Sequence, residues 1–165
     1  MQGGMIELPM SAFPTGVMRG RFRPDDGDLY VCGMFAWAGS ATEPGGLYRL
    51  RATGQPMRLP KELHATKSGL KLTFTEPVDA DRVKPEQFQI QTWSLKRTAN
   101  YGSKHFDEKA LKVRGVTVSE DGKTVTLDVA DLQPTWGMEI KYQLPFADGK
   151  TVEGVIHNTI HALTE

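Results

Sequence analysis

The most regular alternation of apolar and polar residues lies in the second half of the chain, over residues 116–129. Valine or leucine occupies every second position in residues 116–118 and again in residues 125–129. A period of two places one face of each segment in a core and the other face in water. Between the two segments, Asp121 and Gly122 supply the positive φ that a tight turn needs. The pattern predicts a β-hairpin.

The same alternation recurs on both sides of this hairpin. Further strands are predicted from Leu70 to Phe74, from Phe88 to Thr92, from Met138 to Leu144 and from Val152 to Ile160. Counted from Leu70, about six or seven strands follow one another with turn signals at the spacing of a β-sandwich, and no helix of three turns is evident. The sequence therefore predicts an all-β fold.

The first part of the chain, residues 1–58, shows a separate group of short strands. Strands are predicted at residues 17–22, 28–32 and 46–51, the first two joined by a turn rich in proline, aspartate and glycine. These strands resemble one antiparallel sheet the size of a propeller blade, which is marginal alone because it has little surface to bury. Prolines at 56 and 60 mark the boundary, so the predicted domains are 1–58 and 59–165.

The strand pattern is interrupted over residues 93–109, which are predicted to form a loop inserted in the sandwich. Trp93, Tyr101 and His105 lie there among basic and polar residues and are the candidate ligand-binding residues. Long loops with aromatic residues are often functional, but they also serve as ordered covers of a sheet edge. Aromatic rings such as Trp136 and Trp37 could likewise present flat faces to a ligand or fill the core. Both interpretations stay open.

Composition argues against several classes of function. Lys plus Arg number 20 and Asp plus Glu number 20, so the net charge of zero argues against binding of nucleic acid or of an anionic membrane. Arg19, Arg21 and Arg23 are interpreted as a solvated strand face. The single cysteine, Cys32, excludes an internal disulfide and is expected to be a small core residue. No apolar run is long enough to cross a membrane, and the first residues lack the features of a signal peptide.

Catalytic and metal-binding motifs are also missing from the sequence. His157 and His161 have the spacing of a helical zinc site, but on the predicted strand this spacing separates them by about 13 Å. The run PDDGD at residues 24–28 is interpreted as a solvated turn, since it lacks a distal glutamate for calcium. No nucleophile elbow, P-loop or dinucleotide fingerprint occurs. We expect no catalytic residue, metal or cofactor in this chain.

The segment from Leu70 to Gly154 resembles a bacterial immunoglobulin-like module. The resemblance rests on LKLTFTEPVDADRVKPEQFQI, VTVSEDGKTVTLDVADLQP, MEIKYQL and DGKTVEG, which occur in the order of such a module. It implies an immunoglobulin-like β-sandwich for residues 59–165, with residues 93–109 as an insertion.

The wider chain is similar to the C-terminal end of bacterial putative membrane-bound or sorbosone dehydrogenase-like β-propeller proteins. The similar segments are FPTGVMRGRFRPDDGDLYVCGM, GGLYRLRATGQP, WSLKRTANYGS and GVIHNTIH. The resemblance implies a last propeller blade in residues 1–58, a periplasmic or extracellular location, and a non-catalytic structural or interaction module whose partners are upstream blades or another protein domain. The alternatives are a carbohydrate-binding module, or a blade-closing fragment of a quinone-dependent sugar dehydrogenase.

Overall fold

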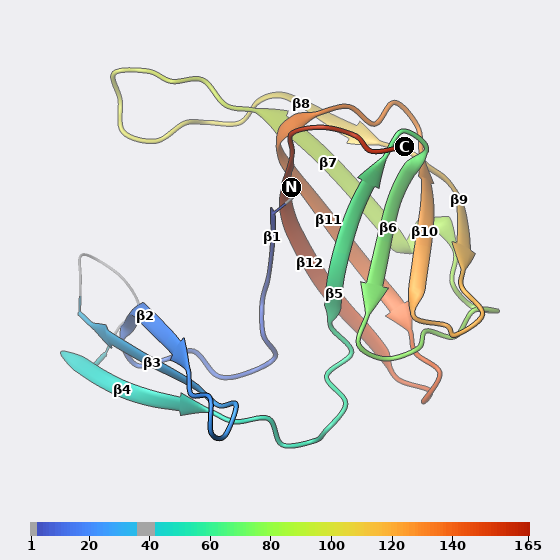
Figure 1. Ribbon diagram of the computed structural model, residues 1–165. Helices are drawn as coiled ribbons and strands as arrows, with labels where there is room; N and C mark the ends of the chain where they lie inside the picture. Colours follow the sequence, from blue (N-terminus) through green and yellow to red (C-terminus); the bar gives the residue numbers. More distant parts are fainter. Residues whose placement is uncertain (1–2, 36–41) are drawn as a thin grey trace. The chain divides into compact units, whose positions relative to one another are not determined.

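The computed structural model describes residues 3–35 and 42–165, and it is built from β-strands (Figure 1). The prediction of an all-β fold is confirmed. The strands are β1 (Gly3–Ile6), β2 (Gly16–Phe22), β3 (Leu29–Met34), β4 (Gly45–Leu50), β5 (Pro60–Thr66), β6 (Gly69–Phe74), β7 (Phe88–Ser94), β8 (Phe106–Leu111), β9 (Val113–Val118), β10 (Thr124–Val129), β11 (Thr135–Pro145) and β12 (Thr151–Ile160). A single 3-10 turn, η1 (Pro85–Gln87), precedes β7 among the described residues.

The chain forms two compact units. Unit 1 consists of Met1–Leu8 and Pro56–Glu165, and unit 2 of Pro9–Gln55. This division differs from the predicted domains 1–58 and 59–165, because β1 pairs antiparallel with β12 in a sheet of unit 1. The three strands of unit 2 are thus inserted in the sequence of unit 1 between β1 and β5. The second boundary, between Gln55 and Pro56, lies three residues before the predicted one.

Unit 1 holds two antiparallel sheets in two layers (Figure 1). One has the strand order β1-β12-β11-β7-β8 and the other β5-β6-β10-β9. The predicted hairpin of residues 116–129 is confirmed as β9 and β10, with Val125 opposite Val118. The chain changes sheet between β8 and β9, at Lys112.

The core of unit 1 is one apolar cluster to which both sheets contribute. Alternate residues of the long strand β11, from Met138 to Leu144, point into it and are buried. Phe74 packs edge to face with Tyr142 and Phe146, with ring centroids 5.6 and 5.8 Å apart. Burial of Tyr142 raises the pKa of its phenol to about 12. This cluster holds the sheets together, and the polar faces of the strands are left for the solvent.

Unit 2 is a three-stranded antiparallel sheet of order β2-β3-β4. Its turn between β2 and β3 is stabilised by Asp26, which accepts a hydrogen bond from the amide of Asp28 at 3.0 Å. That hydrogen bond is the main cause that lowers the pKa of Asp26, and the guanidinium groups of Arg23 and Arg49 add to it. Cys32 is exposed on β3, so the expectation of a core cysteine was wrong.

Candidate functional site

The candidate site lies at the open end of the hairpin formed by β7 and β8. Trp93 and Ser94 are the last residues of β7, and Phe106 is the first residue of β8. The irregular connection is therefore confined to residues 95–105, and the expectation of a loop over all of 93–109 was too wide. This connection, loop 95–105 from here on, extends beyond the paired strands (Figure 1).

Two of the three predicted ligand-binding residues are brought together at the base of loop 95–105. The rings of Trp93 and His105 are stacked, with centroids 4.1 Å apart and planes inclined by 14°. The indole also lies against Gly137 of β11, where a Cβ atom would come within 2.3 Å of the ring. His105 is fixed in turn by Glu108, whose Oε1 lies 3.1 Å from Nδ1. One face of the Trp93 ring is thus covered by His105.

A second set of contacts closes the base of loop 95–105. The ammonium group of Lys96 lies 4.4 Å from the centroid of the Phe106 ring, a cation–π contact. Ser94 Oγ donates a hydrogen bond to Asp107 Oδ2 at 2.6 Å. Ser103 Oγ accepts from the amide of Lys96 at 3.0 Å. These contacts tie both ends of the loop to each other and to the hairpin.

The third predicted residue, Tyr101, lies outside these contacts. Its side chain is fully exposed, and the following residue, Gly102, has a positive φ of 80°. The exposed neighbours Arg97 and Lys104 are basic, and loop 95–105 contains no Asp or Glu. The structure thus separates a ring that is free to make contacts from a stacked pair that holds the loop.

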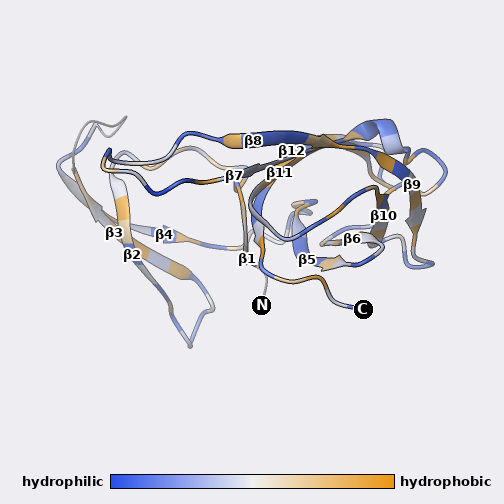
Figure 2. Cartoon of the chain, turned by 90° about the horizontal axis from the view of Figure 1, so that it is seen from above, coloured by the Kyte–Doolittle hydropathy of each residue, from blue (hydrophilic) through white to orange (hydrophobic). Residues whose placement is uncertain are grey.

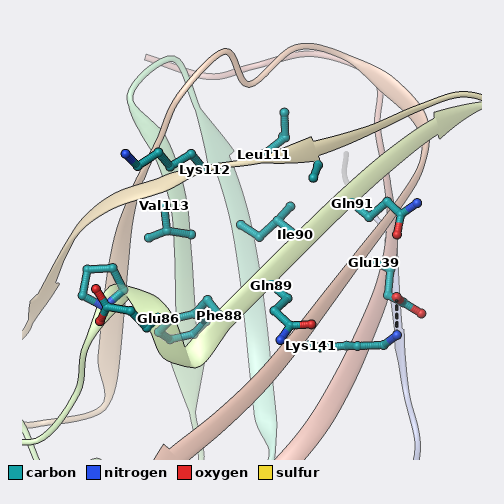
Figure 3. Close-up of a pocket in the computed structure, with 12 residues that line it drawn as sticks. Glu86, Phe88, Gln89, Ile90, Gln91, Leu111, Lys112, Val113, Glu139 and Lys141 are labelled. Carbon is teal, nitrogen blue, oxygen red and sulfur yellow. Dashed lines mark ion pairs between the residues drawn. The ribbon is translucent and has the colours of Figure 1, made fainter.

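A hollow of about 480 Å³ lies farther along the same hairpin (Figure 3). Its apolar lining comes from Phe88, Ile90, Leu111 and Val113, where the chain leaves one sheet for the other. Glu139 and Lys141 line its polar side and form an ion pair with each other at 3.0 Å. No pattern in the sequence pointed to this hollow, because it arises where two strands diverge.

The other sequence candidates are dispersed. His157 lies on β12 with Nε2 4.0 Å from Glu139 Oε2, and His161 follows the end of that strand. In residues 3–35 and 42–165, no three His, Cys, Asp or Glu side chains come together as metal ligands would. Trp136 is exposed on β11, and Trp37 lies outside the described residues. The described part of the chain contains no helix of the length and apolar character that crossing a membrane requires.

Comparison of the chain with protein-family models, with curated proteins and with solved structures gives no match. The functional proposal therefore rests on the residues and geometry described above and on the resemblance seen in the sequence.

Proposed function

We propose that this chain is a non-catalytic structural and interaction module from the C-terminal part of a secreted β-propeller protein of the dehydrogenase-like kind. In this proposal unit 2 serves as a propeller blade, and unit 1 is the appended immunoglobulin-like sandwich. The partners of unit 2 are neighbouring blades or another protein domain. The location that goes with this proposal is the periplasm or the outside of the cell.

The observation that carries the proposal is that both faces of the sheet in unit 2 expose large apolar side chains. Phe22 is 71% exposed and pairs with Leu29, whereas Leu47 is 73% exposed and pairs with Cys32. Residues 29 and 32 point to opposite faces of β3, so Phe22 and Leu47 do as well. Figure 2 shows apolar positions along these strands.

Unit 2 has almost no core of its own. Val31 is its single buried apolar residue among those described, and the remaining buried apolar residues belong to unit 1. A three-stranded sheet with one buried side chain is marginal in water. A propeller blade is instead covered on each face by the next blade, which suits a sheet that exposes large apolar side chains on both faces.

The carbohydrate-binding alternative has less support from the geometry. A sugar ring needs the open face of an aromatic side chain, and His105 covers one face of Trp93. Tyr101 then remains the free ring of the three candidate residues. For the isolated chain we also expect no oxidation of sugars when a quinone cofactor and calcium are added, and such oxidation would contradict the proposal.

The proposal is tested by removing the exposed apolar side chains of unit 2 from the full chain. We expect the wild-type chain to bind a hydrophobic dye and to self-associate as its concentration rises. The double variant Phe22→Ser/Leu47→Ser should lose most of both effects. Met5→Ser is the matched control, because Met5 is 69% exposed but lies in unit 1. A wild-type monomer without dye binding, or an equal loss in the control, would contradict the proposal.

A further inference from the structure

Loop 95–105 concentrates positive charge in a chain that has no net charge. It carries Lys96, Arg97 and Lys104 and contains no acidic residue. Lys96 is used at the base of the loop, where it lies over Phe106. Arg97 and Lys104 are exposed, and neither forms an ion pair within the part of the chain that the structure describes. Two cationic side chains are therefore available to a partner.

Tyr101 lies between these two cations in the sequence and is fully exposed. A large ring without neighbours gains free energy when a partner covers it, since its apolar surface then leaves water. Tyrosine and arginine are also the residue types that most often dominate the free energy of protein–protein binding. Their combination on one short loop is typical of a recognition element.

The base of loop 95–105 is fixed before any partner binds. The stack of Trp93 on His105 and the contact of Lys96 with Phe106 join the two ends of the loop. A loop that is ordered in advance loses less conformational entropy when it binds. The residues at the base therefore hold the loop in place. Arg97, Tyr101 and Lys104 are the residues that contact the partner.

We propose that loop 95–105 binds an acidic peptide segment of a partner protein. Arg97 and Lys104 pair with carboxylates of the segment, and the ring of Tyr101 packs on an apolar side chain between them. This site belongs to unit 1 and is independent of the role proposed for unit 2.

The size of the patch favours a short peptide over other anions. Single-stranded nucleic acid is bound along a basic groove with several stacking rings, over roughly 4 to 16 nucleotides. Loop 95–105 offers two free cations and one free ring, and the chain as a whole has no net charge to attract a polyanion.

The test is a selection of peptides from a displayed random library on the full chain. We expect enrichment of sequences that combine Asp or Glu with an apolar residue, and binding that weakens as salt is added. Both Tyr101→Ala and the double variant Arg97→Glu/Lys104→Glu should weaken the selected peptides by about tenfold or more. Thermal midpoints of these variants should equal that of the wild type, because all three side chains are exposed.

The matched control is Lys71→Glu/Lys150→Glu, which changes the net charge equally at exposed positions of unit 1 outside loop 95–105. Its peptide affinity should fall much less than that of the loop variant. A selection without acidic enrichment, or acidic peptides that bind the loop variants as tightly as the wild type, would overturn the proposal. Loop-dependent binding of polygalacturonate or oligothymidylate in place of acidic peptides would overturn it as well.

Discussion

Gly122 shows how much one residue can specify in this fold. Its φ of 71° lies in the region that residues with a side chain rarely adopt. Its amide donates to the carbonyl of Ser119 at 2.9 Å, and its own carbonyl accepts from the amide of Val78 at 2.8 Å. The same glycine closes the hairpin of β9 and β10 and joins that hairpin to the segment after β6.

Replacement of Gly122 by valine should destabilise unit 1 by about 1 kcal/mol or more, because a β-branched residue is strained at this φ. A Cβ atom at this position would also come within 2.9 Å of Pro77. The control is Gly149→Val, where φ is 83° but no atom lies within 4 Å of the added Cβ. Urea denaturation should show a larger loss for Gly122→Val than for the control. An unchanged midpoint would contradict the role given to this turn.

Single residues also show which features could and could not be predicted from the sequence. The pair Asp121-Gly122 predicted its turn because the signal is local, and Asp121 Oδ1 indeed accepts from the amide of Lys123 at 3.0 Å. The exposure of Cys32 could not be predicted in this way. Its neighbours on β3 are apolar, but whether they are covered depends on distant parts of the molecule. The contact of Trp93 with Gly137 is equally non-local.

At the scale of elements, the strands that the sequence missed lie at sheet edges. Edge strand β8 (FDEKAL) has one buried residue, Leu111, so its polar positions do not alternate with apolar ones. Edge strand β5 begins at a proline and carries charged residues. Such features blunt the edges of natural sheets. They also erase the period of two by which the central strands were recognised.

The pairing of β7 with β11 allows a test of whether Trp93 holds loop 95–105 in place. The variant Gly137→Ala places a methyl group 2.3 Å from the Trp93 indole, so the ring must move and its stack with His105 must loosen. We expect a loss of about 1–3 kcal/mol and faster tryptic cleavage after Arg97 and Lys104. Gly115→Ala is the control, since its nearest neighbour, the Cβ of Asp128, lies 3.9 Å away. Equal cleavage rates in both variants would show that Trp93 does not hold the loop.

At the scale of the whole molecule, one predicted boundary lies three residues from a division between the two units, and the other division was not predicted. Unit 1 resumes at Pro56, the first of the two prolines that mark the predicted boundary and three residues before the predicted start of the second domain. The start of unit 2 was missed because β1 (Gly3–Ile6) is short and rich in glycine, and its partner β12 lies at the other end of the chain. Pairing between such distant segments leaves no local pattern.

The division into two units predicts two levels of stability within one chain. Hydrogen bonds of a sheet are protected from exchange when opening them exposes a buried core. The segment 17–31 crosses unit 2, which buries Val31 alone among its described apolar residues, whereas the segment 116–129 belongs to the large cluster of unit 1. Amide hydrogen exchange should therefore be much faster in residues 17–31 than in residues 116–129.

This comparison of two segments within one chain must be made at a concentration at which sedimentation shows a monomer. Self-association would cover unit 2 and slow its exchange. Equal protection of the two segments in a monomer would mean that unit 2 is stabilised within this chain, and the proposed need for neighbouring blades would be wrong.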